Sequence, residues 1–363
     1  MRKQISAPPK GLPSINKTNP GTARRRVLAK VAYMFAASCC MNLPKLAECS
    51  TKDSVLGPRS IAYEFSNGEL VYAIRMSDVF DIRLSFKPVG INGLYNFGDI
   101  CIAPNSGTLP RLGTSRDWKK VTTEGSDWLG PYILSATENI DSSQLWRSGY
   151  FTGGTHDSMN RQHEGVPTAR NVLASFAVDG IPLLTARGGF ADEISIKLVN
   201  RIQANNTTRE VLEETYRLTI RSAQCLVDYE NRALESILIR RHYGLQVCAS
   251  GFQDRVRFIS GQHVDWVTPH ENDKINAGPY GQFPSVYRIC LAGPSGGLTM
   301  WVDPEYGIAT RRPIDPTASA GLFDMYGNVG KAYEVMVSTA RGFHLRVGDS
   351  YAFRGGYVWG TET

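Results

Sequence analysis

Residues 171–247 constrain the fold of this chain more than any other stretch. They contain five short runs rich in β-branched and aromatic residues, with no helical segment between them: 171–184, 193–205, 215–221, 225–231 and 235–247. Strands joined by such short connections pair antiparallel, because a parallel pair needs a long crossover. In the second run, Ile194, Ile196 and Leu198 alternate with polar residues, which places the apolar side chains on one face. The centre of the chain is therefore predicted to be an antiparallel sheet.

The same pattern extends to both sides of this centre. Asn67-Gly68, a strong hairpin signal, separates two of the upstream runs, 61–65, 70–76 and 80–86. Downstream runs follow at 255–260, 286–293, 297–307, 331–338 and 344–360. The segment 209–217 contains good helix formers, but it leads straight into an alternating run and is predicted to be a strand. We expect an all-β protein, a large antiparallel two-sheet sandwich with few short helices.

The first 57 residues differ from the rest of the chain and are interpreted as an N-terminal leader. Arg24-Arg25-Arg26 precedes a short apolar stretch with small residues, which is typical of a secretory signal, while Lys30 interrupts that stretch. Ala36-Ala37-Ser38-Cys39 also resembles the lipobox of bacterial lipoproteins, and an ordinary amphipathic helix is the alternative. We expect a secreted or periplasmic protein, lipid-anchored if Cys39 is modified, with an apolar stretch too short for an integral membrane span. Residues 58–363 then form one β-sandwich domain or two closely joined subdomains.

Charge and motif content exclude several function classes. The net charge is +6, and much of the basic excess lies in the leader, so no clustered basic face for nucleic acid is expected. The chain has no P-loop, no dinucleotide fingerprint and no C-x-x-C pair. We therefore expect no metal and no cofactor. Cys225, Cys248 and Cys290 lie in or beside strand-like runs, which favours free buried thiols, and disulfides remain open if the chain is exported.

Residues 146–170 are expected to form a long loop that carries chemistry. Gly153, Gly154, Gly165 and Pro167 break regular structure there, and Gly153-Gly154 would let the backbone approach a ligand closely. A histidine beside a carboxylate is a proton acceptor tuned near neutral pH, and arginine binds anions with a planar fork. An ordinary surface loop is an equal alternative. The candidates for catalysis are His156 and Arg161, and those for substrate binding are Trp146, Asp157, His163 and Glu164.

A second candidate is the run IRRHYGLQ at 239–246, inside an expected strand. If side chains alternate, Arg240 and His242 face one side while Arg241 and Tyr243 face the other. A sheet face with Arg, His, Tyr and Gln246 would suit a glycan cleft, and a solvated edge strand is the alternative. The segment 260–285 is expected to be another polar loop, with His263 and Tyr280 as binding candidates.

The runs TYRLTIR, CLVDYEN and ILIRRHYGLQ resemble the supersandwich of galactose-mutarotase-like aldose epimerases and of the β domains of polysaccharide lyases. The resemblance covers about 170–305 and lies in the rhythm of the strands. It implies a concave sugar-facing sheet on which His, Tyr, Arg or carboxylate groups transfer protons. The paired histidines and late glutamate of the epimerases have no assigned counterparts in this chain.

The leading hypothesis is an exported enzyme that cleaves a polysaccharide, with an anionic one favoured, by β-elimination. Arg161 or Arg241 would neutralise the uronate carboxylate, His156 or His242 would act as the base, and Tyr243 as the acid. A glycoside hydrolase that uses two of Asp157, Glu164, Asp265 and Glu271 is the first alternative. A non-catalytic glycan-binding or adhesion module is the second. The partner is an oligo- or polysaccharide in all three cases, and the oligomeric state is not indicated.

Overall fold

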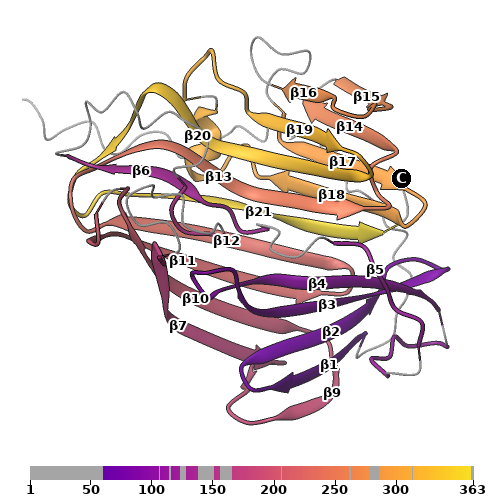
Figure 1. The fold of residues 1–363 in the computed structure, drawn as a ribbon. Coiled ribbons are helices and arrows are strands. Elements are labelled where there is room, and N and C mark those ends of the chain that lie inside the picture. The colour runs from indigo at the N-terminus through magenta and orange to yellow at the C-terminus, as the bar shows by residue number, and fades with distance from the viewer. Residues whose placement is uncertain are drawn as a thin grey trace, which may run out of the picture. The chain divides into compact units, whose positions relative to one another are not determined.

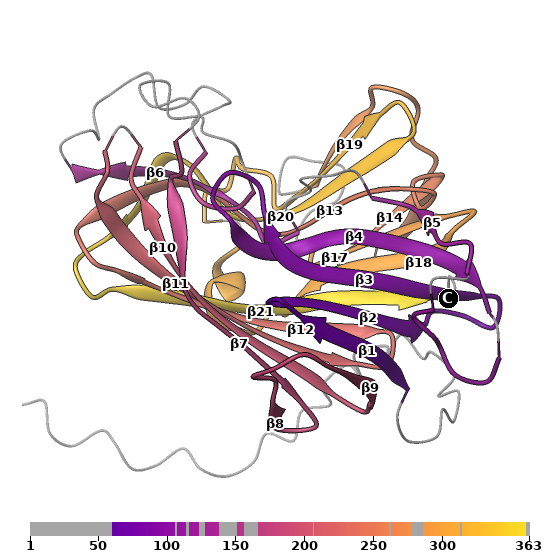
Figure 2. The same cartoon turned by 60° about the horizontal axis from the view of Figure 1, so that its bottom comes forward.

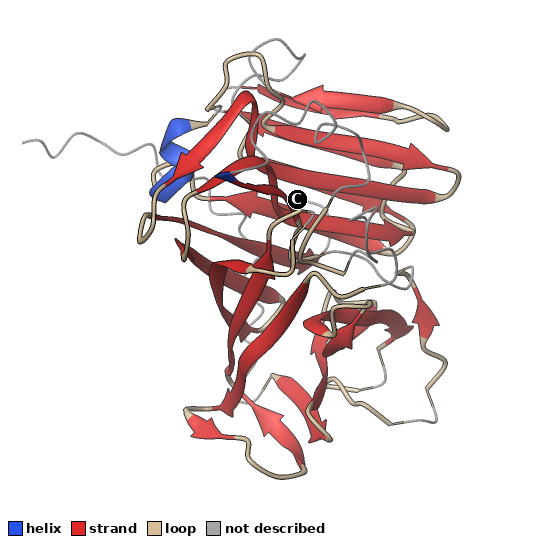
Figure 3. Cartoon of the chain, turned by 60° about the vertical axis from the view of Figure 1, so that its left-hand side comes forward, coloured by secondary structure: helices blue, strands red, loops and turns tan. Residues whose placement is uncertain are grey.

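The computed structural model describes residues 60–105, 107–113, 116–122, 128–137, 151–155, 166–205, 207–260, 263–277, 286–312 and 314–360. The chain divides into two units after Glu48, and all described residues belong to the second, Cys49–Thr363. The predicted leader lies outside the described residues. The described part is built of strands, with one short 3-10 helix, η3 (Gly307–Arg311), and no α-helix (Figure 3). No described helix is long and apolar enough to cross a membrane.

The strands form three sheets (Figure 1). The six-stranded sheet contains, in spatial order, β5 (Lys119–Lys120), β4 (Leu94–Pro104), β3 (Phe80–Val89), β2 (Glu69–Arg75), β1 (Ile61–Ser66) and β9 (Arg187–Ala191). The five-stranded sheet contains β16 (Lys274–Ala277), β19 (Gly321–Tyr326), β20 (Val329–Leu345), β13 (Ile237–Ser250) and β6 (Tyr132–Ala136).

The third sheet is the largest, with ten strands. It contains β15 (His263–Val267), β14 (Arg255–Ser260), β17 (Arg288–Gly293), β18 (Gly296–Val302), β21 (Ser350–Gly360), β12 (Gln224–Ala233), β11 (Glu210–Arg221), β10 (Ile194–Gln203), β7 (Ala169–Val178) and β8 (Ile181–Pro182). Neighbouring strands in it pair antiparallel, as in β10 with β11 and β12 with β21. The prediction of an all-β antiparallel sandwich is confirmed, with one of its two layers divided into two sheets.

Local turn chemistry explains how the hairpins form. Asn67 and Gly68 join β1 to β2 with φ values of 51° and 76°, and Asp179 and Gly180 join β7 to β8 with 48° and 77°. Asparagine, aspartate and glycine tolerate this left-handed region, which the two-residue hairpin turn requires. The segment 209–217 is part of strand β11, as predicted.

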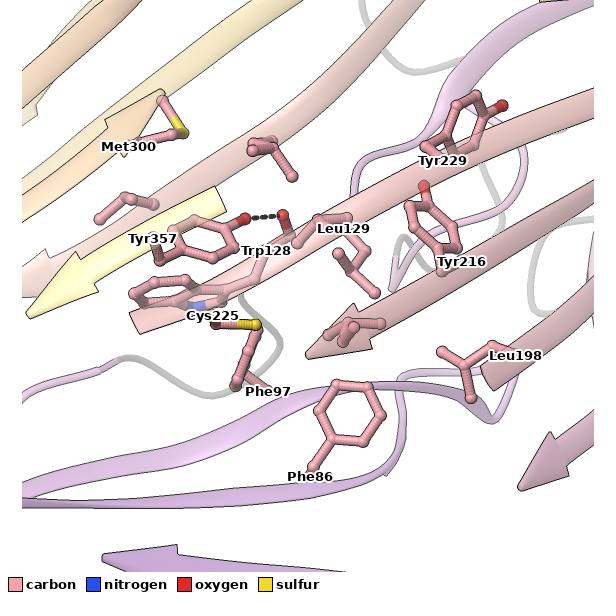
Figure 4. Close-up of a cluster of buried hydrophobic side chains, with 14 of the residues drawn as sticks. Phe86, Phe97, Trp128, Leu129, Leu198, Tyr216, Cys225, Tyr229, Met300 and Tyr357 are labelled. Atoms are coloured by element: carbon pink, nitrogen blue, oxygen red, sulfur yellow. Dashed lines mark hydrogen bonds between the residues drawn. The ribbon is translucent and has the colours of Figure 1, made fainter. Parts of the chain in front are cut away.

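The inner face of the ten-stranded sheet packs against both smaller sheets (Figure 2). Phe97 of β4 lies 5.5 Å from the ring of Trp128 and 5.8 Å from that of Tyr357 in β21, in edge-to-face geometry (Figure 4). The Tyr357 hydroxyl donates a hydrogen bond to the Trp128 carbonyl, so the polar end of this buried ring is satisfied. This aromatic contact fixes the six-stranded sheet on the ten-stranded sheet.

Two segments differ from the sequence prediction. The range 260–285, expected to be a polar loop, contains β15 and β16, because His263–Val267 continues the ten-stranded sheet and pairs with β14. After β12, the chain leaves the ten-stranded sheet, and β13 pairs with β20 and β6 in the five-stranded sheet. The fifth run of the central series therefore faces the other four across the core.

Candidate functional site

Strand β13 separates the residues that the sequence suggested for catalysis. The His242 ring points into the core, where it lies 4.2 Å from the Tyr132 ring and 5.1 Å from that of Tyr229. The Tyr243 ring lies on the opposite face, 5.6 Å from Phe151 and 4.9 Å from Tyr333. Because consecutive strand residues point to opposite faces, these two candidates do not share a site.

The outer face of β13 carries a group of cations and aromatic rings, which we term the tyrosine–arginine cluster: Phe151, Arg241, Tyr243, Lys331 and Tyr333. Arg241 Nη1 donates a hydrogen bond of 3.0 Å to Tyr243 Oη, and its guanidinium lies 5.5 Å from the Tyr243 ring centre. The Lys331 ammonium lies 5.0 Å from the Tyr333 ring centre. Each cation is thus held against a phenol ring.

The pairing of β13 with β20 brings these residues together. Tyr243 pairs with Val335 and Gln246 pairs with Tyr333, with an irregularity in the register between them. Ile133 of β6 and Val335 of β20 are buried beside Tyr243 and form the apolar floor of the cluster. The three strands come from distant parts of the sequence, so the local pattern identified Arg241 and Tyr243 but not their partners on β20.

The environment of Tyr243 keeps its phenol protonated. Burial raises the pKa of the Tyr243 phenol, while the adjacent Arg241 charge and hydrogen bond lower the pKa in part. Burial also raises the pKa of Tyr333, and the negative charge of Asp324 adds to this effect. Both phenols therefore stay protonated at neutral pH. With Arg241 and Lys331 half-buried beside them, the cluster combines two cations with two protonated phenols.

The stem Phe151–Thr155 is held firmly beside the cluster. Asn92 donates from Nδ2 to the carbonyls of Gly153 and Gly154 at 3.3 and 3.1 Å, and Asn92 Oδ1 accepts from the Thr168 amide at 2.7 Å. A Cβ on Gly90 would lie 2.4 Å from the Thr155 carbonyl oxygen, so the turn between β3 and β4 also touches the stem. The residues on either side of 156–165 are thereby fixed at one place.

The inner face of the same strand pair carries a buried polar network that the sequence analysis missed. Glu214 Oε2 accepts a 2.8 Å hydrogen bond from Tyr132 Oη, and Glu214 Oε1 accepts one of 2.8 Å from Asn200 Nδ2. The alternation in β11 could have indicated that Glu214 is buried, because Glu214 lies on the same face of the strand as the buried residues Leu212 and Tyr216. Burial raises the pKa of Glu214 to about 7. It lowers the pKa of His242 to about 3.

The remaining sequence candidates have varied positions. Gln246 is buried, with its amide N–H bonded to the Trp128 carbonyl, and neither polar atom of its side chain has a hydrogen-bond partner. His263 and Asp265 belong to β15, and their side chains are outside the description, while Glu271 is exposed. Within the described residues, no group of three or more His, Cys, Asp or Glu could hold a metal ion. Outside the described residues lie Trp146, His156, Asp157, Arg161, His163, Glu164 and Tyr280.

Comparison with solved structures finds similar proteins at low sequence identity. The galactosidase domain of the alpha-galactosidase–sucrose kinase AgaSK matches with a TM-score of 0.40 and 9% identity over 81% of this chain and 41% of that one. A putative aldose 1-epimerase from Klebsiella pneumoniae matches with a TM-score of 0.36 and 10% identity, over 81% of this chain and 80% of that one.

A third match is a GH36 alpha-galactosidase from Geobacillus stearothermophilus in complex with stachyose, with a TM-score of 0.38 and 10% identity over 79% of this chain. The chain spans 41% and 40% of the two galactosidase chains. No protein-family model matches the chain, and no curated protein matches it in sequence.

Proposed function

We propose that the tyrosine–arginine cluster binds an anionic polysaccharide and that the protein cleaves this polysaccharide by β-elimination. The observation that carries the proposal is the 3.0 Å hydrogen bond from Arg241 Nη1 to Tyr243 Oη on the outer face of β13, where Arg241 is half-buried and Tyr243 is buried. Uronate elimination needs a cation at the carboxylate and a proton donor at the leaving oxygen a few ångströms away. A guanidinium bonded to a protonated phenol supplies both groups in one place.

Each group has a defined part in the proposed step. Arg241 pairs with the uronate carboxylate and stabilises the charge that develops on it when the C5 proton is removed. The electrons of the C5–H bond form the C4–C5 double bond, and the bond from C4 to the glycosidic oxygen breaks. Tyr243 gives its proton to that leaving oxygen, and the base later returns a proton to the phenolate through solvent.

The base is assigned from the sequence alone. His242 is buried on the other face of β13 and is not part of this proposal. His156 follows the fixed stem residue Thr155 directly in sequence and is the preferred base, although it lies outside the described residues. An exported location remains part of the proposal, because polysaccharide substrates are met outside the cytoplasm. Sequencing the N-terminus of the protein recovered from the native host tests export.

The test is an assay of the purified protein against a panel of uronate polysaccharides, following the ultraviolet absorbance of the unsaturated product. We expect turnover by the wild type, with Tyr243→Phe slowed by about 10²–10⁴-fold, as for loss of a positioned proton donor. Arg241→Ala should be slowed by about 10²–10³-fold through loss of charge stabilisation. Arg217→Ala removes a half-exposed arginine from the outer face of the ten-stranded sheet and is the matched control, with turnover unchanged.

The same assay separates the alternative functions. New reducing ends without the unsaturated chromophore would show that the reaction is glycoside hydrolysis and not elimination. The carboxylates to substitute would then be Asp157, Glu164, Asp265 and Glu271. Binding without turnover that is lost in Arg241→Ala would leave a glycan-binding or adhesion module. If the folded protein neither binds nor cleaves any uronate polysaccharide, the proposal is rejected.

A further inference from the structure

The buried network behind the cluster is a closed circuit of hydrogen bonds and ring contacts. Tyr132 Oη contacts both Glu214 Oε2, at 2.8 Å, and Tyr229 Oη. Asn231 Nδ2 donates to Tyr229 Oη at 3.0 Å, and Asn231 Oδ1 accepts from the Tyr351 amide at 3.1 Å.

His242 closes the network, because it contacts both Tyr351 and Tyr132. Tyr351 Oη and His242 Nδ1 are 2.8 Å apart, and the His242 ring stacks on Tyr132 with planes inclined by 10°. Glu214, Tyr229 and His242 are all buried between the sheets. A polar network enclosed in this way transmits a change at one member to the others, because each lost hydrogen bond leaves an unsatisfied group.

The network is mechanically connected to the cluster on the other face. Tyr132 and His242 are cross-strand partners in β6 and β13, and each directly precedes a cluster-face residue, Ile133 and Tyr243. The Tyr132 backbone also exchanges two hydrogen bonds with Thr152, at 2.9 and 2.8 Å. Thr152 follows Phe151, whose ring packs on Tyr243. A shift of Tyr132 therefore moves the floor and the stem together.

The proton on Glu214 determines the direction of the hydrogen bonds. When Glu214 is ionised, the single Tyr132 O–H must donate to the carboxylate, so Tyr229 donates to Tyr132. When Glu214 is protonated, its O–H can donate to Tyr132 Oη, and Tyr132 then donates to Tyr229. Burial places the pKa of Glu214 at about 7, so both arrangements are populated near neutral pH.

We infer that Glu214 is a positioning residue for the tyrosine–arginine cluster, acting through Tyr132 and His242, and that its proton makes the cluster respond to pH. This deepens the proposed function and rests on it for the identity of the ligand. The groups that face Glu214 come from every element packed around it: Tyr132 on β6, Asn200 on β10, Tyr216 on β11, Tyr229 and Asn231 on β12, His242 on β13 and Tyr351 on β21.

The first test follows the ring signals of ¹³C-labelled tyrosine by NMR across pH 5–9, with Tyr132 and Tyr243 assigned by substitution to Phe. In the wild type we expect both signals to titrate with a midpoint near 7. Glu214→Gln keeps hydrogen-bonding capacity but cannot ionise, so this titration should disappear from Tyr132 and from Tyr243. Suppose that Tyr132 titrates in the wild type but that the Tyr243 signal titrates in Glu214→Gln as it does in the wild type. Glu214 then does not act on the cluster, and the inference is overturned.

Two controls make this result specific. Glu334 is a second buried carboxyl, paired with Arg312 at 2.9 Å, and burial also raises its pKa to about 7. Glu334→Gln should leave the Tyr132 titration intact. Tyr72→Phe removes another buried phenol, one whose hydroxyl has no hydrogen-bond partner, and should change neither signal. Tyr132→Phe breaks the link to Glu214 and should abolish the Glu214-dependent part of the Tyr243 titration.

The second test measures binding of a uronate oligosaccharide as a function of pH. We expect the dissociation constant of the wild type to change with a midpoint near 7 and that of Glu214→Gln to be flat over the same range. A wild-type profile identical to that of Glu214→Gln would overturn the inference even if binding is strong. If no uronate binds, the proposed function fails, whereas the tyrosine titration still decides the role of Glu214.

Discussion

His242 shows how strongly burial changes the pKa and the hydrogen-bonding role of a single side chain. Its sequence context, between Arg241 and Tyr243, is polar, yet its ring is fully buried and burial lowers its pKa to about 3. The neutral imidazole therefore serves as a hydrogen-bond partner for Tyr351 and as a stacking surface for Tyr132. The alternation of β13 was predictable from the sequence. Which of its two faces would be covered by the ten-stranded sheet was not, because β12 and β21 pack there from distant positions in the sequence.

The lowered pKa of His242 gives a signed prediction for stability. The unfolded chain binds a proton at this residue below about pH 6.5, whereas the folded chain does so only near pH 3, so the contribution of His242 to stability is lost as pH falls through this window. Relative to the wild type, His242→Asn should regain about 1.3 kcal/mol between pH 7 and pH 5.5, because the dependence approaches about 1.4 kcal/mol per pH unit only below pH 6.5. Urea unfolding at both pH values measures the difference. An offset independent of pH would contradict it.

Asn92 gives a second prediction at this scale. Its side chain bonds Gly153, Gly154, Thr168 and Ala169, and all of these contacts are buried. Asn92→Ala leaves several backbone groups without partners and should cost about 3 kcal/mol of unfolding free energy. Asn105→Ala, which loses a single part-buried bond to the Ser77 carbonyl, should cost about 1 kcal/mol. Equal costs for the two variants in urea titrations would show that the stem is not held by Asn92.

At the scale of elements, the sequence predicted strands where side chains alternate and turns are marked. β10 and β11 are of this kind, and so are the Asn67-Gly68 and Asp179-Gly180 hairpins. β6 was missed because its five residues are buried on both faces and show no alternation. β15 was missed because its polar sequence resembles a loop, and only pairing with β14 makes it a strand. The order of the strands within the sheets could not be predicted from the sequence. β13 pairs with β20, which lies about 90 residues later in the chain, and local patterns do not encode such pairing.

The close approach of Gly130 to β13 is testable. A Cβ on Gly130 would lie 2.0 Å from the Tyr243 carbonyl oxygen, which is backbone and cannot rotate away. Gly130→Ala should therefore push β13 away from the segment that contains Gly130, just before β6. The variant should lower the unfolding free energy by about 1–3 kcal/mol or more. It should also weaken uronate binding, because Tyr243 moves with its backbone. Gly360→Ala is the control, since its nearest neighbour would be 3.8 Å away, and it should be close to neutral in both measurements.

At the scale of the whole described unit, three sheets share one apolar core. Phe97 of β4 touches Trp128, Tyr357 and Trp359, and so joins the six-stranded sheet to the ten-stranded sheet. The five-stranded sheet packs on the same inner face through Tyr132 and His242. Because no smaller part encloses its own core, the described unit is expected to unfold as one cooperative body.

Phe97→Ala tests this expectation. The variant leaves a cavity where the sheets meet and should cost about 3–5 kcal/mol. Tryptophan fluorescence, which reports on the six tryptophans of the chain, including Trp128 and Trp359 in the core, and far-ultraviolet circular dichroism should give coincident unfolding curves in the wild type and in the variant. Val79→Ala, at an exposed position, should shift neither curve appreciably. Separated transitions in the wild type would indicate that the sheets unfold independently.

The two-sided character of β13 has a practical consequence for redesign. On the outer face of β13, Arg241 is half-buried and can be exchanged for other side chains, whereas Tyr243 is buried against Ile133 and Phe151. The same freedom does not hold on the inner face, since any substitution at His242 is felt on both sides of the strand. A library restricted to the half-buried outward positions, such as Arg241 and Lys331, would change the outer surface while the buried packing stays in place.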